Sequence, residues 1–477
     1  MAEEKVMQDN VVERKPIVIP TTQADIDRAE VLKAAANKLF QERHYEGAIE
    51  KYTDAISANP SVAAYYSNRA FAYIKRELYG AAIRDADSAL TIDPRFVKAY
   101  YRRANAVKDF RSVVKVAPSD PDARIKLREC EKEFKRVEFE RAIASDEAPV
   151  DVMDKIGDLD SIVVDSDYSG PRFGDDGQPI TLEFVKEMME HLRLQRKLHR
   201  KYALRIMVAA KDLFTPLPSL VDVSINSPDA RLTICGDIHG QYYDLLNIFE
   251  LNGLPSPDNM YLFNGDFVDR GSFSVECILT LLAFKVLYPS GMYLSRGNHE
   301  TNDMNKVYGF EGECKAKYSD LTFRLFEQIF NAIPLGQVVG GKILVIHGGL
   351  FSRDDVTLDQ LREINRFRQP GQSGLMCELL WSDPQHEMGR SPSKRGVGLQ
   401  FGPDVTKAFL DANGLDVLVR SHEVKQSGYE IMHDGKCVTI FSAPNYCDSV
   451  GNEGAFIRVG QDLKLDYVKF TAVEHPN

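Results

Sequence analysis

The sequence predicts a multidomain fold in which an all-α solenoid of helical repeats is followed by a larger α/β (α+β) domain. Three observations support this prediction. The chain has 477 residues, which is more than one hydrophobic core usually organises. Alanines and prolines recur at a fixed spacing in the N-terminal part, and beyond residue 231 short apolar runs end in polar residues. Helical repeats produce the first pattern, and alternating strands and helices produce the second.

Composition and charge restrict the class of protein. The chain has 44% hydrophobic and 27% charged residues, which is typical of globular domains. Its net charge of -11 opposes binding to nucleic acid and to anionic lipid. We therefore expect no nucleic-acid partner.

The cysteines and the apolar stretches indicate the compartment. Seven cysteines are scattered without a Cys-x-x-Cys pair, which favours reduced thiols over a disulfide framework or a zinc knuckle. The N-terminus has no signal-peptide pattern. The longest apolar stretch, residues 278–288, contains Lys285 and is too short to span a bilayer. We expect a cytoplasmic and nuclear monomer with no membrane span.

A 34-residue repeat marks the N-terminal part. Pro60 and Pro94 are 34 residues apart. At the same spacing, small alanines coincide in pairs: Ala36 and Ala70, Ala48 and Ala82, and Ala55 and Ala89. This is the length of a tetratricopeptide repeat, in which small residues let two helices approach closely. We predict a disordered tail over residues 1–24 and a tetratricopeptide domain over residues 25–144, with a generic helical bundle as the alternative.

The third repeat departs from this pattern. The 34-residue spacing puts its closing proline at position 128, but the proline that closes it is Pro118, so ten residues are missing between its helices. A capping helix is predicted over residues 122–144. Residues 145–180 hold ten acidic residues against Lys155 and Arg172, which predicts an acidic linker. The second domain, residues 181–477, then begins with an amphipathic helix over residues 184–206.

In the second domain, polar clusters follow the predicted strands. Apolar runs end at residues 235, 263, 294, 346 and 419. The clusters after them contain Asp237 and His239, then Asp266 with Asp269 and Arg270, then Asn298 and His299, then His347, and finally His422. The carboxyl ends of strands are where such sheets bind ligands. A turn-capping role would explain one Asp-x-His, but not five clusters in succession.

These residue types favour a metal centre. Carboxylate, amide and imidazole groups without thiolates suit manganese, iron or zinc. Two such ions, roughly 3.5–4 Å apart, would polarise a phosphoryl group and lower the pKa of bound water from about 15.7 towards about 7. The sequence therefore predicts a phosphoester hydrolase with two divalent metal ions, and we expect manganese to support its activity in vitro.

Three runs carry a resemblance to a known family: Gly236-Asp-Ile-His-Gly240, Gly265-Asp-Phe-Val-Asp-Arg-Gly271 and Arg296-Gly-Asn-His-Glu300. Through them the chain resembles the PPP family of serine/threonine phosphoprotein phosphatases. The resemblance implies a metallophosphoesterase domain with a central β-sandwich flanked by helices, acting on phosphoserine and phosphothreonine in proteins. The alternatives are another metallophosphoesterase, such as a phosphodiesterase, and a co-chaperone scaffold with an inactive phosphatase domain.

The resemblance also implies roles for individual residues. Six residues would bind the metal ions: Asp237 and His239 on one, Asn298, His347 and His422 on the other, and Asp266 on both. His299 would protonate the departing oxygen, with Asp269 orienting its imidazole. Four residues would hold the phosphate oxygens: Arg270, Arg395, Tyr446 and Asn298.

Five residues of the repeats match a tetratricopeptide carboxylate clamp: Lys33, Asn37, Asn68, Lys98 and Arg102. Clustered cations and amides hold the terminal carboxylate of a peptide. The implied partner is the Glu-Glu-Val-Asp tail of the ninety-kilodalton heat-shock chaperone. The resemblance further implies autoinhibition by the repeat domain, with release by chaperone or lipid. The shortened third repeat and the sequence end soon after Phe470 predict higher basal activity and weaker stimulation than in relatives.

Overall fold

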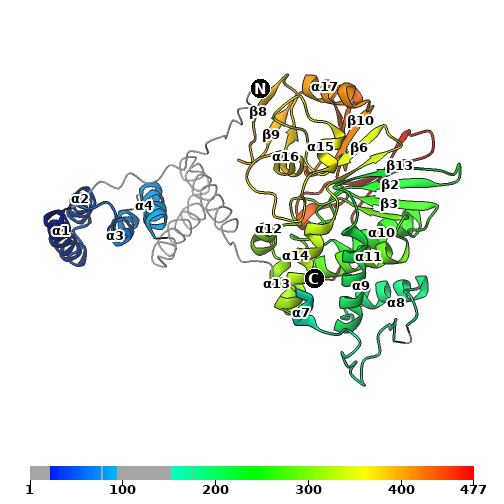
Figure 1. Cartoon of the computed structure of the whole chain (residues 1–477), viewed down its shortest axis with the longest axis horizontal. Helices are drawn as coiled ribbons and strands as arrows, with labels where there is room; N and C mark the ends of the chain where they lie inside the picture. Colours follow the sequence, from blue (N-terminus) through cyan, green and yellow to red (C-terminus); the bar gives the residue numbers. More distant parts are fainter. Residues whose placement is uncertain (1–21, 77–78, 94–151, 176, 477) are drawn as a thin grey trace, which may run out of the picture. The chain divides into compact units, whose positions relative to one another are not determined.

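The structure, a computed structural model, describes residues 22–76, 79–93, 152–175 and 177–476 (Figure 1). The chain divides into two units, Met1–Arg141 and Ala142–Asn477. The described part of the first unit contains four helices: α1 (Gln23–Gln41), α2 (Tyr45–Ala58), α3 (Ala63–Lys75) and α4 (Tyr79–Ile92). Thr22 begins α1 with a capping box that pairs its side chain and backbone with Asp25.

Alanines lie between these helices, as the repeat spacing predicts. All six alanines of the predicted pairs are fully buried, and α1 packs on α2, α2 on α3 and α3 on α4. Arg69 of α3 also pairs with the buried Asp85 of α4 at 2.7 Å. These contacts confirm the helical tetratricopeptide region. The third repeat and the capping helix lie outside the described residues.

Two mixed β-sheets organise the second unit. The first has the strand order β1 (Leu220–Val223), β5 (Gly336–Val339), β6 (Ile343–Ile346), β10 (Val417–Arg420), β12 (Cys437–Ile440) and β11 (Tyr429–Met432). The second has the order β14 (Leu465–Phe470), β13 (Gly454–Val459), β2 (Arg231–Cys235), β3 (Asn259–Phe263) and β4 (Met292–Leu294). A small third sheet has the order β7 (Asp383–Pro384), β9 (Leu399–Phe401) and β8 (Arg390–Pro392).

Alternating side chains place the sheets face to face. On β2, Leu232 and Ile234 pack against Val345 and Val419 of the other sheet, whereas Cys235 faces the opposite way. This period of two residues produces an apolar layer between the sheets. Fully burying one such aliphatic side chain stabilises the fold by about 1.5–3 kcal/mol.

Helices cover both outer faces (Figure 1). The outer face of the five-stranded sheet is covered by α10 (Tyr242–Asn252) and α11 (Ser274–Leu287). Beyond them, α8 (Leu182–Arg193) and α9 (Arg200–Phe214) pack on α11, and α14 (Asp320–Ala332) packs on α9. The six-stranded sheet is covered by α15 (Leu358–Arg362), α16 (Leu375–Trp381) and α17 (Pro403–Asn413). Two further short helices, α12 (Asn302–Tyr308) and α13 (Phe310–Lys317), follow β4. The predicted α/β sandwich flanked by helices is confirmed.

The amphipathic helix predicted over residues 184–206 is instead two helices, α8 and α9. Gln195, at a φ of 56°, lies just beyond the last residues of α8, and the side chain of His199 caps α9. The prediction was wrong because the apolar spacing continues across this break. Periodicity alone does not register a left-handed residue between two helices.

Residues 158–175, here called the acidic segment, lie against α9. Arg205 pairs with Asp160 at 2.6 Å and with Asp175 at 3.0 Å, and it donates to the carbonyl of Phe173 at 2.6 Å. The hydroxyl of Tyr202 donates to Asp175 at 2.6 Å. Within the predicted linker, this stretch is therefore a packed part of the second unit.

Candidate metal centre

The predicted metal ligands lie at the carboxyl ends of neighbouring strands. Strands β2, β3 and β4 are parallel to one another, as are β6 and β10. Each of the five predicted strands is present and ends just before its polar cluster. The two sheets therefore bring loops from distant parts of the chain to one edge of the sandwich.

Several of these loop residues have left-handed backbones. The φ angles of His239, Asp266, Asp269, Arg270 and His422 lie between 47° and 74°. Such conformations cost about 1–3 kcal/mol each in residues other than glycine, and they persist only where the surrounding structure holds them. Their concentration here indicates that the fold positions these side chains at the expense of local strain.

Two glycines let the loops after β3 and β4 touch. Gly265 has a φ of +88°, and a Cβ there would lie 2.5 Å from Gly297 Cα and 2.7 Å from His347 Nδ1. A Cβ on Gly297 would collide with Asp266. A side chain at Gly265 would therefore displace Gly297 or His347, and a side chain at Gly297 would displace Asp266.

Asp266 lies between two groups of candidate ligands. Its Oδ2 is 3.5 Å from His239 Nε2 and 3.3 Å from His347 Nε2. On the first side, Asp237 Oδ2 is 3.7 Å from His239 Nε2. One carboxylate oxygen thus faces an imidazole nitrogen from each group.

The second group forms around His347. Its Nε2 is 2.8 Å from Asn298 Oδ1 and 3.2 Å from His422 Nδ1. The backbone N–H of His422 donates to Asp237 Oδ1 at 3.2 Å, which joins the two groups again. The structure therefore brings all six predicted ligands together.

Backbone carbonyls select the ring nitrogens that face the centre. His239 Nδ1 is 3.0 Å from the carbonyl oxygen of Val268, and His347 Nδ1 is 2.8 Å from that of Asn264. A carbonyl can only accept a hydrogen bond, so we assign the ring proton to each Nδ1. Each Nε2 is then free to offer its lone pair to a cation.

The converging acceptors fit bound cations. The six side chains are at most 7% exposed, and their nitrogen and oxygen atoms turn towards one another. Two overlapping groups have ligand atoms within 4.8 Å of one another: His239, Asp266 and His299, and Asp266, His347 and His422. Buried lone pairs facing each other repel unless a positive charge lies among them. This donor set suits divalent metal ions.

The charge states of Asp266, His239 and His422 agree with metal binding, whereas Asp266 and Asp237 outweigh burial and raise the pKa of His347 to about 9, and burial raises the pKa of Asp237 to about 7. Burial alone would raise the pKa of Asp266, but the imidazoles of His347 and His299 hold it well below its usual value. Burial lowers the pKa of His239 to about 3 and that of His422 far below the usual value. An ionised carboxylate and neutral imidazoles are the forms that coordinate metals.

Asp269 and His299 form a buried pair beside the ligands. His299 Nδ1 donates to Asp269 Oδ2 at 2.8 Å, and the ring lies 4.7 Å from the ring of His239, centroid to centroid. Burial opposes protonation of His299, but Asp266 and Asp269 outweigh it and raise its pKa. The Nε2 atom is the ring nitrogen left to face a substrate.

The predicted phosphate-binding side chains are held by neighbours. The guanidinium of Arg270 lies 3.7 Å from the ring centroid of Tyr308. Arg395 donates to Asp383 at 2.6 Å and to the carbonyl of His422 at 2.9 Å. The ring centroid of Tyr446 lies 5.1 Å from that of His239.

The residues that hold these side chains in place were not predicted. Glu300 accepts the backbone N–H groups of Asp266, Phe267 and Gly297, each at 2.8 Å. Glu300 ends one of the quoted runs and Asn264 directly precedes another, so both residues could have been identified from the motifs. Three others, Tyr308, Asp383 and Asn305, reach the site only through tertiary folding.

In the N-terminal unit, three of the predicted clamp residues are described. Asn37 Oδ1 accepts from the hydroxyl of Tyr52 at 2.6 Å and from Asn68 Nδ2 at 3.4 Å. Lys33 lies one helical turn before Asn37 on α1 and pairs with Glu30. The other two clamp residues, Lys98 and Arg102, lie outside the described residues.

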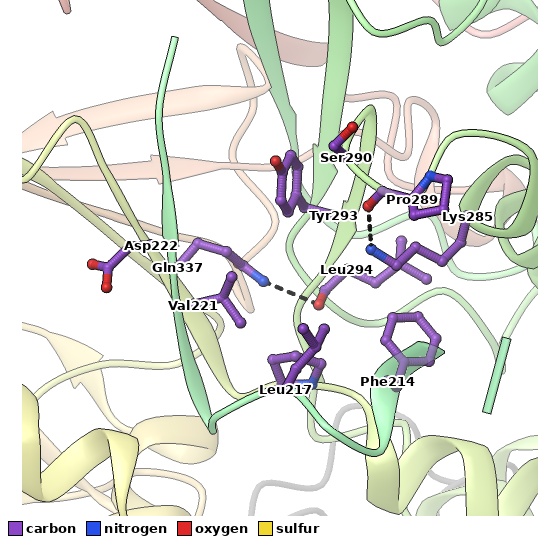
Figure 2. Close-up of a pocket in the computed structure, with 11 residues that line it drawn as sticks. Phe214, Leu217, Val221, Asp222, Lys285, Pro289, Ser290, Tyr293, Leu294 and Gln337 are labelled. Atoms are coloured by element: carbon purple, nitrogen blue, oxygen red, sulfur yellow. Dashed lines mark hydrogen bonds between the residues drawn. The ribbon is translucent and has the colours of Figure 1, made fainter. Parts of the chain in front are cut away.

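A cavity of about 320 Å³ lies apart from these sites (Figure 2). It lies beside the edge strands β1 and β4, and Lys285 in its wall donates to the carbonyls of Pro289 and Met292 at 2.6 and 3.0 Å. Gln337 donates to the carbonyl of Leu294 at 3.1 Å. None of its lining residues is a predicted site residue.

The described helices include none that is long and apolar enough to cross a membrane.

Comparisons with known proteins agree with this geometry. A Calcineurin-like phosphoesterase family model matches residues 230–426, and a PPP5 TPR repeat region model matches residues 127–222. Human serine/threonine-protein phosphatase 5 is 53% identical over 469 residues, covering 96% of this chain and 93% of the human protein. Serine/threonine-protein phosphatase T of Schizosaccharomyces pombe is 54% identical over 459 residues, covering 94% and 96%.

A solved structure extends the agreement to three dimensions. It is a protein serine/threonine phosphatase from Saccharomyces cerevisiae described as similar to human phosphatase PP5. The similarity has a TM-score of 0.61 at 45% identity and covers 62% of this chain and 98% of that one. With the helical repeats, the flanked sandwich and the buried His/Asp groups, this shows that the chain belongs to the serine/threonine-protein phosphatase 5 family and is a serine/threonine protein phosphatase.

Proposed function

We propose that this phosphatase hydrolyses phosphoserine and phosphothreonine at two divalent metal ions held by Asp237, His239, Asp266, Asn298, His347 and His422. The observation that carries the proposal is Asp266 Oδ2, which lies 3.5 and 3.3 Å from the Nε2 atoms of His239 and His347. Manganese, iron and zinc all suit this ligand set. Such ions supply Lewis-acid polarisation of the phosphoryl group and lower the pKa of water.

Arg270, Arg395 and Tyr446 orient the phosphate. The contact of Asp383 with Arg395 at 2.6 Å and that of Tyr308 with Arg270 at 3.7 Å fix both guanidinium groups before substrate arrives. Fixed groups lose less side-chain entropy when the substrate binds. Asn298 turns its Oδ1 towards His347, which leaves its amide nitrogen to donate to the phosphate.

His299 acts as the general acid. The alkoxide of serine or threonine is a strongly basic leaving group, so its oxygen needs a proton as the phosphorus–oxygen bond breaks. Asp269 accepts the Nδ1–H of His299 at 2.8 Å, which holds the ring so that its Nε2 faces the departing oxygen. The proton passes from Nε2 to that oxygen, and the ring is left neutral.

The acid assignment can be tested with Asp269→Asn and His299→Asn. Each variant should lower turnover of a phosphoserine peptide by about 10²–10⁴-fold, because proton transfer to the leaving oxygen is lost. Elemental analysis should find nearly unchanged metal content. Full activity in either variant would rule out its assigned role.

In the same proposal, the tetratricopeptide domain (25–144) docks the acidic C-terminal tail of the ninety-kilodalton chaperone. The contact of Asn37 with Asn68 at 3.4 Å, and Lys33 one turn away, support a site for a carboxylate. Through the linker (145–180), this domain restrains the catalytic domain (181–477) until the chaperone tail or an activating lipid binds. We propose that the protein acts as a monomer in cytoplasm and nucleus.

A further inference from the structure

Asn305 contacts both members of the Asp269–His299 pair. It is fully buried on the short helix α12. Its Nδ2 donates to Asp269 Oδ2 at 3.0 Å and to the backbone carbonyl of His299 at 2.6 Å. One amide group therefore binds both the side chain of Asp269 and the backbone of His299.

The chemistry of these partners fixes the orientation of the amide. Both partners are oxygen acceptors, and the amide nitrogen has two hydrogens to offer. The reversed amide would turn Oδ1 against two oxygens, so only the observed orientation is favourable. The hydrogen bonds of Asn305 therefore set the spacing between Asp269 and the backbone of His299.

The segment around Asn305 is itself fixed to the site. The backbone N–H of Phe310 donates to Asp269 Oδ1 at 2.9 Å, and the carbonyl of Tyr308 accepts from the backbone of Arg270 at 3.1 Å. Asp269 thus receives three donors, from His299, Asn305 and Phe310. Of these, Asn305 is the one that also holds the backbone of His299.

We propose that Asn305 is a positioning residue for proton transfer to the leaving oxygen. It holds Asp269 and His299 at a fixed separation, so that the imidazole Nε2 stays aligned with the departing oxygen. It does not touch the substrate. The inference rests on the proposed role of His299 as the general acid.

This role predicts a loss that depends on the leaving group. A serine oxygen must be protonated as it leaves, whereas p-nitrophenolate is stable enough to leave without a proton. A misplaced acid therefore slows the first reaction and spares the second. A general loss of structure would slow both reactions equally.

The experiment compares a phosphoserine peptide with p-nitrophenyl phosphate in the full chain. In Asn305→Ala, kcat for the peptide should fall about 10–100-fold, part of what a general acid supplies. The kcat for p-nitrophenyl phosphate should fall less than about threefold, with KM for both substrates and metal content nearly unchanged. Asn305→Asp has the same size but sets a carboxylate against Asp269, so it should show at least the same selectivity. If the alanine variant does not fold, Asn305→Asp alone tests the inference.

Asn252→Ala serves as the matched control. Asn252 is 2% exposed and donates to Thr233 and Tyr261 at 2.8 and 2.7 Å. Its removal should lower the melting temperature while leaving the ratio of the two rates unchanged. A changed ratio in this control would mean that loss of a buried amide alters the ratio without any contact to the acid pair, which would overturn the inference.

Other outcomes separate the inference from the function it rests on. Equal losses on both substrates, or no loss, in the Asn305 variants would overturn the positioning role. His299→Asn in the same assay should show the strongest selectivity. If His299→Asn is selective and the Asn305 variants are not, only the positioning role fails. If His299→Asn slows both substrates equally, the general-acid assignment fails and the positioning role fails with it.

Discussion

At Asp266, backbone strain and hydrogen bonding meet in a residue that we propose to bridge two metal ions. Its φ is 53°, and its backbone N–H donates to Glu300 at 2.8 Å. Its Oδ1 accepts the backbone N–H of His299 at 2.8 Å, which leaves Oδ2 to face the two ligand groups. The side chain is therefore held from three directions before any ion binds.

Asp266→Asn should release both metal ions. The amide is the same size, but it lacks the charge that attracts two cations and offers one oxygen instead of two. Elemental analysis should find little metal in this variant, and turnover should fall with it. Asp222→Asn is the control, because Asp222 pairs with Arg362 at the surface and should keep its metal. A metal content equal to that of the parent protein would refute the bridging role of Asp266.

The clustering of the six predicted metal ligands could be predicted from the sequence because each follows a strand within a few residues. Glycines beside Asp237, Asp266 and His347 mark the tight turns that such loops require. Asn305 gave no comparable signal. Its partner Asp269 is 36 residues away, and an asparagine on a short helix has no periodicity that would indicate its role.

At the scale of elements, α9 and the acidic segment form one structural piece. Arg205 is 12% exposed at its side chain and contacts Asp160, Asp175 and the carbonyl of Phe173. The acidic residues of this segment predicted a linker, but Arg205 of α9 partly neutralises two of them, Asp160 and Asp175. The composition of the segment shows its carboxylates, but it cannot show that Arg205, some 30 residues or more along the chain, contacts them in the folded structure.

Arg205→Ala should lower the stability of the second unit by about 1–3 kcal/mol, because several charge-assisted hydrogen bonds are lost from a largely buried group. Thermal unfolding of the full chain would measure the change. Arg193→Ala is the control, since its pair with Glu190 is about half exposed and such pairs contribute about 0–1 kcal/mol. Equal shifts in the two variants would argue that the acidic segment is not held by Arg205.

Other elements differ in how well the sequence predicted them. The strands that carry site motifs, such as β2 and β6, were predicted because apolar runs precede glycine-flanked polar residues. The strands β7 and β8 are two and three residues long and carry no alternation to detect. The break at Gln195 was missed because one left-handed residue leaves the apolar spacing of its neighbours intact.

At the scale of the whole molecule, the candidate metal centre lies in the second unit and the helical repeats lie in the first. The contact-defined boundary falls between Arg141 and Ala142, and the packed acidic segment belongs to the second unit. A catalytic fragment should therefore begin at residue 142, so that Asp160 and Asp175 stay with Arg205.

Comparing the full chain with residues 142–477 tests the proposed restraint. The fragment should turn over a phosphopeptide faster, because the repeat domain is absent. A chaperone tail peptide should speed the full chain and leave the fragment unchanged. Restoring the ten missing residues of the third repeat should lower the basal rate and enlarge the stimulation. Equal basal rates of the restored and present chains would count against a regulatory role of the third repeat.

The separation of the ligands along the chain also sets when activity can first appear. His422 donates to Asp237 across 185 residues of sequence. Domains fold from the N-terminus as the ribosome extends the chain at about 5–20 residues per second, so this stretch takes on the order of ten to forty seconds to make. During that interval the nascent chain carries Asp237 and lacks His422. Under the proposed function, newly made chains are silent as phosphatases until His422, which follows β10 of the six-stranded sheet, has been made, while the repeats proposed to bind a chaperone have already been synthesised.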